Sequence, residues 1–306
     1  MESHTPDVRR GIPLALGAGI LFGLSAPLSK LIVASMEPVA LAGALYLGAF
    51  IAASAGRLLG VTRGLQSTPL GRRDVPFVAV MVGVGGVLAP VLLMYGVRAA
   101  TGFTASLLLN LEGVTTALIA WALFRERVTP RVWGAVALMT AAGVLLTGIV
   151  TGERASVLGP LLIVGAAIGW GVDNNVSARL SHCDPLVLIS IKGLAAGLFS
   201  SGLSWAMSGS LPAVRDLLAG LGVGCVSYGV SLVLFVLSLK AMGAARTGAF
   251  FAVGPLAGAL LSLLIFRSSF TWMMTLALVL TAGSIALVAG DGLATDTKPA
   301  NVHQGR

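Results

Sequence analysis

Charged side chains are scarce in this 306-residue sequence. Asp, Glu, Lys and Arg together make up 10% of the residues, whereas 56% are hydrophobic and the mean hydropathy is +0.94. A single soluble core of this length cannot bury so much apolar surface. We therefore predict an all-α membrane protein whose solvent is lipid.

Groups that bind metals or act as nucleophiles are also few. The three histidines are His4, His182 and His303, and the two cysteines, Cys183 and Cys225, match no zinc, haem or redox spacing. We interpret both cysteines as packing residues. No nucleotide-binding loop is present, and the net charge of +8 forms no basic stripe that would indicate nucleic acid. The sequence thus predicts no metal, no cofactor, no nucleic-acid partner and no enzymatic activity.

Ten apolar segments are long enough to cross a bilayer core of ~30 Å. Their expected bounds are Ile12–Ala34, Pro38–Gly60, Pro76–Val97, Gly102–Phe124, Arg131–Ile149, Val157–Leu180, Pro185–Met207, Leu217–Leu239, Ala245–Phe266 and Trp272–Ala289. Fourteen of the twenty basic residues fall on the side of the two termini. The positive-inside rule therefore predicts that both termini are cytoplasmic, in the cell (inner or plasma) membrane.

The second half of the chain repeats features of the first at an offset of 142 to 148 residues. The matched positions are Phe22-Gly23 with Trp170-Gly171, Pro38 with Pro185, Arg98 with Lys240, Gly113 with Pro255, and Phe124-Arg125 with Phe266-Arg267. Because five is odd, the second copy crosses the membrane in the opposite sense. We predict two inverted five-helix repeats, 1–150 and 151–290, around a central cavity, and a disordered cytoplasmic tail, 291–306.

Two stretches carry a family resemblance. The segment LFGLSAPLSKLIV followed by Pro38, and the run Leu107–Leu146, resemble the EamA branch of the drug/metabolite transporter superfamily. The resemblance implies ten helices, cytoplasmic termini and a substrate cavity between the halves. Glu112-Gly113 stands where the second repeat has Gly254-Pro255, so substrate preferences do not carry over from the family.

Ionisable residues inside a membrane are costly and therefore point to functional sites. Glu112 is expected near the bilayer midplane, with Thr115 and Thr116 on its helical face. Desolvation favours its protonated form, so it could exchange a proton for substrate. The alternative is a permanently protonated Glu that donates one structural hydrogen bond.

A second polar cluster, Asp173-Asn174-Asn175, corresponds to Ser25-Ala26-Pro27 in the repeat. Both copies are expected to interrupt an apolar helix, which is a pointer to a binding site. Lys192 lies at a similar depth to Asp173, and the two could form an ion pair. That pair is either structural or a gate that substrate opens.

Further candidates come from the same helices. Asn110 and Lys30 are candidates for substrate or proton binding; the alternative for Lys30 is that its side chain snorkels to the headgroups. Possible cavity-wall residues, which could equally be packing residues, are Phe22, Trp170, Tyr95 and Tyr228. Small-residue pairs that allow close helix crossings are Gly19/Gly23, Gly165/Gly169, Gly220/Gly224 and Gly254/Gly258, and candidate bend points are Pro27, Pro90 and Pro255.

These features favour a secondary transporter of a small organic metabolite or drug-like compound, exporting it in exchange for protons. One alternative is an exchanger or importer of a small organic anion that contacts Lys30 or Lys192. Alternatives from other classes are a membrane enzyme acting on lipid and a non-transporting assembly or sensor protein. The sequence leaves the substrate open, and it also leaves open whether the chain forms a homodimer.

Overall fold

The computed structural model describes residues 8–64, 67–124, 129–146, 157–242, 247, 250–267 and 270–296. All regular secondary structure in these residues is helical. The elements are α1 (Val8–Gly23), α2 (Ser25–Ile32), α3 (Pro38–Leu58), η1 (Arg72–Asp74), α4 (Val75–Val80), η2 (Met81–Leu88), α5 (Ala89–Ala99), α6 (Gly102–Leu108), α7 (Leu111–Phe124), α8 (Pro130–Leu146), α9 (Leu158–Arg179), α10 (Pro185–Ser208), α11 (Val214–Val223), η4 (Gly224–Val230), α12 (Ser231–Met242), α14 (Gly254–Phe266) and α15 (Trp272–Asp296). Each of the ten predicted segments contains helix.

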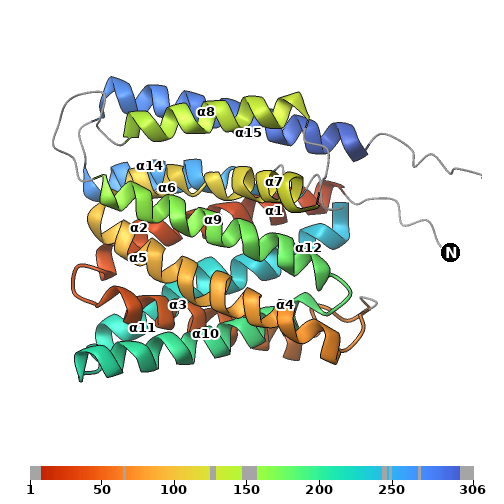
Figure 1. The fold of residues 1–306 in the computed structure, drawn as a ribbon, viewed down its shortest axis with the longest axis vertical. Helices are drawn as coiled ribbons and strands as arrows, with labels where there is room; N and C mark the ends of the chain where they lie inside the picture. Colours follow the sequence, from red (N-terminus) through yellow and green to blue (C-terminus); the bar gives the residue numbers. More distant parts are fainter. Residues whose placement is uncertain are drawn as a thin grey trace, which may run out of the picture.

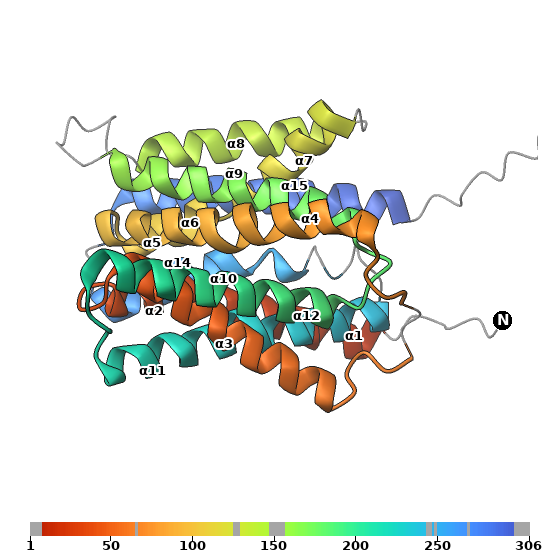
Figure 2. The same cartoon turned by 60° about the horizontal axis from the view of Figure 1, so that its bottom comes forward.

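The helices lie side by side with their axes in roughly one direction (Figures 1 and 2). Six helical spans are long and apolar enough to cross a membrane: Arg9–Ile32, Pro38–Leu58, Arg72–Ala99, Gly102–Leu123, Pro185–Ser208 and Val214–Met242. Three shorter apolar helices accompany them. Large apolar side chains such as Leu198, Phe199 and Trp205 are exposed on the outside of α10, as expected for a surface in contact with lipid. The chain is therefore built as a multi-pass membrane protein.

Helices from the two halves of the chain pack in a paired pattern. Two contacts join corresponding helices, α3 with α10 and α8 with α15, and α6 packs on α14, which lies in the span that corresponds to its own. Two further sets of contacts correspond between the halves. α1 packs on α12 and α14, and its counterpart α9 packs on α5 and α7, the counterparts of α12 and α14. Figure 1 shows α8 and α15 together at one end of this stack and α3 and α10 near the other. The interior lies between these two pairs.

Close helix crossings depend on glycine, as the sequence predicts. A Cβ on Gly23 of α1 would lie 2.0 Å from the carbonyl oxygen of Gly254, and one on Gly258 would lie 2.3 Å from that of Gly23. At the crossing of η4 and α3, a Cβ on Gly224 would lie 2.1 Å from the carbonyl oxygen of Leu45. Backbone meets backbone at these points, so a larger residue would force the helices apart.

Three helical interruptions coincide with the predicted proline bend points. The α-helix breaks at Leu24 because Pro27 has no N–H to bond the carbonyl of Gly23. The π-helix η2 directly precedes α5, whose second residue is Pro90, and a turn precedes Pro255 of α14. A second π-helix, η4, begins 143 residues after η2 and contains no proline.

The expected break at Asp173-Asn174-Asn175 is absent. α9 runs without interruption from Leu158 to Arg179, through all three polar residues. These residues place polar side chains on the helix surface, but none of them is proline, so the backbone hydrogen bonds of α9 continue. The prediction of an interrupted helix at this position was wrong, and the polarity of the site comes from side chains alone.

Candidate functional site

Glu112 stands at the start of a helix inside the span Gly102–Leu123. The span is broken at Leu109 and Asn110, and α7 begins at the next residue, so Glu112 occupies its first turn. The N–H of Glu112 bonds the carbonyl of Leu109 across this break, at 3.0 Å. The Oε1 atom of Glu112 accepts a hydrogen bond of 2.9 Å from the Nδ2 of Asn174 on α9. The two polar positions predicted separately from the sequence are thus in direct contact.

A strip of polar groups continues this contact along α7 and α9. The amide of Asn174 also donates to the hydroxyl of Thr116 at 3.1 Å, and the amide of Asn175 donates to the carbonyl of Thr116 at 3.0 Å. Thr115 donates to the carbonyl of Ala167 at 2.8 Å. The helices come this close because Gly171 faces Thr115, whose Oγ1 lies 2.6 Å from the place of an added Cβ.

Asp173 and Lys192 form an ion pair between α9 and α10, which confirms the predicted partnership. The Asp173 side chain is 7% exposed and that of Lys192 is 17% exposed. Gly85 and Gly86 of η2 pack against this pair, and a Cβ on Gly85 would lie 2.2 Å from the Cγ of Asp173. The charges are therefore enclosed by η2, α9 and α10.

The carbonyl oxygen of Gly85 accepts two hydrogen bonds from aromatic side chains. The Tyr46 hydroxyl donates to it at 2.8 Å and the Trp170 indole N–H donates at 2.9 Å. Both side chains are buried. The π-helical turn before Pro90 thus presents a carbonyl to side chains from α3 and α9, and it ties η2 to both helices. Neither Tyr46 nor Gly85 was a predicted site residue.

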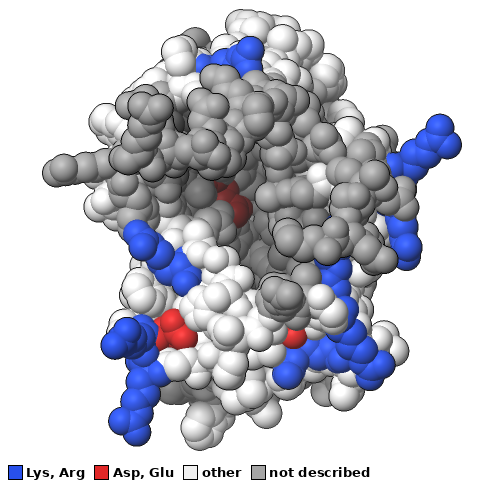
Figure 3. Space-filling view, turned by 90° about the vertical axis from the view of Figure 1, so that its right-hand side faces the viewer, with Lys and Arg blue, Asp and Glu red and all other residues white. Residues whose placement is uncertain are grey.

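The ionisable side chains of this interior interact with one another through their charges. Glu112 lies within electrostatic range of both Asp173 and Lys192. The amide nitrogen of Asn110, buried at the break between α6 and α7, has no hydrogen-bond partner among the described residues. Figure 3 shows a hollow with an acidic side chain on its floor, in the face where α1 begins and α15 ends. Lys and Arg side chains lie on the same face.

Three of the four aromatic candidates surround one region. The Phe22 ring lies 5.9 Å from that of Tyr228 and 5.4 Å from that of Phe251, between ring centroids. Tyr228 in turn lies 5.8 Å from Tyr46, which shares the Gly85 carbonyl with Trp170. This aromatic cluster joins α1, α3, η4 and α9.

Tyr95 and Lys30 lie outside this cluster, where each forms hydrogen bonds at the end of a neighbouring helix. The Tyr95 hydroxyl donates to the carboxylate of Glu37 at 3.0 Å, and Glu37 caps the start of α3. The Lys30 ammonium donates to the carbonyls of Val97 and Arg98 at 2.8 and 2.9 Å, in the last turn of α5. A cation at a helix C-terminus stabilises the helix. The observed contacts of Lys30 are therefore structural.

Three side chains of types that can ligate metals lie together apart from this interior, and this group was not predicted. Asp74, His182 and Cys183 place one ligand atom each within 4.8 Å of one another. The sequence spacing did not reveal the group, since 108 residues separate Asp74 from His182. The adjacent His182-Cys183 pair was the one available signal.

Comparison with known proteins identifies two matched regions. The model of the EamA-like transporter family matches residues 9–149 and again residues 157–290. An uncharacterized transporter of Methanothermobacter thermautotrophicus is 30% identical, over 84% of this chain and 79% of that protein. A solved crystal structure has a TM-score of 0.66 and 20% identity, covering 95% of this chain and 98% of its own chain. That last likeness concerns the fold.

Proposed function

This chain belongs to the EamA-like transporter family, and we propose that it is a secondary active transporter that exports a small organic solute in exchange for protons. The family lies within the drug/metabolite transporter superfamily. Membership makes the chain a multi-pass membrane transporter. The solute class, the direction and the coupling to protons belong to the proposal.

We further propose that ten helices cross the membrane as two inverted repeats, 1–150 and 151–290. The paired packing of α3 with α10, α6 with α14 and α8 with α15 supports this arrangement. So does the recurrence of a π-helix after 143 residues, within the repeat offset in the sequence. The excess of basic residues beside the termini supports a cytoplasmic location for both of them.

The observation that carries the coupling proposal is the hydrogen bond from Asn174 to Glu112. A carboxylate in a water-poor interior can gain and lose a proton at low free-energy cost only if neighbouring groups stabilise both its charged and its protonated form. The Asn174 amide donates a hydrogen bond to the Glu112 carboxylate and so favours its charged form. A solute that donates a further hydrogen bond to the Glu112 carboxylate would stabilise its charged form and lower its affinity for the proton, as an exchange of solute for proton requires.

The anion-transporting alternative receives less support from the contacts. Lys192 is paired with Asp173, and Lys30 caps α5. An anion would have to compete with an enclosed carboxylate for Lys192. We propose that the Asp173–Lys192 pair instead fixes α9 against α10 beside the site, and that opening it is not required for solute to bind.

The test begins with the solute. Intracellular metabolite profiles of a deletion strain and an overexpressing strain identify the compound whose level changes in opposite directions. Purified protein in proteoliposomes should then move that compound when a pH gradient is applied. Glu112→Gln should abolish gradient-driven flux, whereas Asp216→Asn, at the start of α11, should leave it unchanged. Gradient-driven flux that persists in Glu112→Gln would contradict the coupling role.

A further inference from the structure

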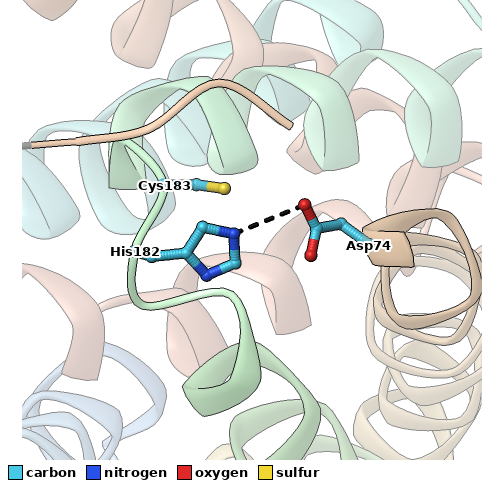
Figure 4. Close-up of side chains that lie close together, drawn as sticks. All are labelled: Asp74, His182 and Cys183. Atoms are coloured by element: carbon cyan, nitrogen blue, oxygen red, sulfur yellow. Dashed lines mark hydrogen bonds and ion pairs between the residues drawn. The ribbon is translucent and has the colours of Figure 1, made fainter. Parts of the chain in front are cut away.

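Asp74, His182 and Cys183 converge where the first and second halves of the chain meet outside the helix interior. Asp74 ends η1 and precedes α4, and the other two residues lie in the turn between α9 and α10. Figure 4 shows the three side chains directed toward one another. The Nε2 of His182 lies 3.3 Å from the Oδ2 of Asp74, and all three ligand atoms lie within 4.8 Å.

These separations approach those of a tetrahedral metal site. Bonds of about 2.0 Å to N and O and about 2.3 Å to S place neighbouring ligands roughly 3.3 to 3.5 Å apart. The His182–Asp74 separation already has that value. The Cys183 sulfur needs to approach its neighbours by about 1.3 Å at most to share one ion with them.

Hydrogen bonds position both segments independently of any ion. The N–H of Gly71 donates to the Asp74 carboxylate at 2.8 Å, and the N–H of Thr68 donates to the carbonyl of His182 at 2.8 Å. The Thr62 hydroxyl donates to Asp184 at 2.8 Å, next to Cys183. Ligands held in place before binding cost less entropy to assemble.

The charges also favour a cation. Cys183 is buried whereas His182 is exposed, so the group has one open side. A divalent ion in place of the thiol proton would neutralise the thiolate and the carboxylate together.

We propose that Asp74, His182 and Cys183 bind a divalent transition-metal ion of the zinc class, with water in a fourth position. One S, one N and one O donor suit Zn²⁺ and leave it a neutral complex, whereas Mg²⁺ and Ca²⁺ prefer oxygen ligands alone. The ion would clamp the α9–α10 turn onto the start of α4. This site is separate from Glu112, so it stands or fails independently of the transport proposal.

Metal titration of the purified full chain, with any purification tag removed, tests the site. Calorimetry should show one Zn²⁺ bound per chain and no heat from Mg²⁺. With Co²⁺ as the probe, a thiolate-to-metal charge-transfer band should appear in the near ultraviolet. Cys183→Ser should abolish that band, whereas Cys225→Ser should keep it, because Cys225 is the other free cysteine and lies in η4.

His182→Ala keeps the test independent of folding defects at the buried cysteine. This side chain is 43% exposed, so the variant should elute as the folded protein in size-exclusion chromatography and bind Zn²⁺ at least tenfold more weakly. Absence of stoichiometric Zn²⁺ binding to the unmodified chain would overturn the proposal. Equal Zn²⁺ affinity in Cys183→Ser, His182→Ala and Cys225→Ser would overturn it as well.

Discussion

Two helix crossings occupy corresponding places in the two halves, and they differ in chemistry. At α1 with α14, Gly23 packs on Gly254, and Phe22 packs on Phe251. At α7 with α9, Gly171 packs on Thr115, and beside it Asn174 donates to Glu112. Close backbone approach is common to both crossings, but the titratable group lies at one. The two crossings therefore share their backbone packing and differ in the polar and titratable side chains beside it.

The largest expected effect comes from filling the apolar crossing. Gly23→Val places a branched side chain where even a Cβ would lie 2.0 Å from the carbonyl of Gly254, so α1 and α14 must separate. Overpacking ordinarily costs about 1–3 kcal/mol, and contact with backbone leaves little room for relief. We expect no folded protein in size-exclusion chromatography.

Gly202→Ala is the matched control for that substitution, because nothing lies within 4 Å of the added Cβ in α10. The variant should fold normally. A folded, active Gly23→Val protein would contradict the close backbone contact between α1 and α14.

The next effect concerns the ion pair beside the polar crossing. Lys192→Met leaves Asp173 enclosed without its partner, so we expect a loss of about 3–5 kcal/mol in the free energy of unfolding. The double variant Asp173→Asn/Lys192→Met should recover most of that loss, because it leaves no unpaired charge. Thermal unfolding in detergent measures both.

Transport by the double variant separates the two roles of this pair. A structural pair predicts flux close to that of the unmodified protein once stability is recovered. A gate predicts a stable protein without flux, and that result would extend the functional chemistry from α7–α9 to α10.

A smaller effect is expected at the Gly85 carbonyl. Tyr46→Phe and Trp170→Phe each remove one of its two donors and leave the other, so each should cost about 1 kcal/mol. Removing both leaves a buried carbonyl without these partners and should cost more than the sum. Unfolding of the two single variants and the double variant measures this coupling, and strict additivity would contradict a shared role.

The smallest effect is expected at Lys30, on the continuation of α1. Lys30→Met removes two hydrogen bonds to the last turn of α5, which we expect to lower the stability by about 0.5 kcal/mol because the site is partly exposed. Solute flux should be retained. Loss of flux from a stable Lys30→Met protein would instead assign this side of the molecule a role in binding.

Several of these features could be predicted from the sequence because hydropathy and position determine them. The Glu112 and Asn174 positions were recognisable as polar groups in apolar segments, and the depth of Asp173 and Lys192 predicted their pairing. Glycine spacing similarly predicted the approach of Gly23 to its partner helix.

Other features depend on contacts that no local pattern contains. The unbroken course of α9 through Asp173 reflects backbone hydrogen bonds that persist when only side chains become polar. The bonds from Tyr46 and Trp170 to Gly85 need a π-helical carbonyl, which residue spacing does not reveal. Asp74 meets His182 only because two distant turns pack together.

The most direct measurement of the central claim is proton release when solute binds. In weakly buffered detergent solution, the unmodified protein should release about one proton per bound solute molecule, because a solute that donates a hydrogen bond to Glu112, as Asn174 does, stabilises its charged form. Glu112→Gln should bind solute and release none, and Asp216→Asn should behave as the unmodified protein does. Equal proton release from Glu112→Gln and the unmodified protein would contradict the claim that solute and proton meet at the α7–α9 crossing.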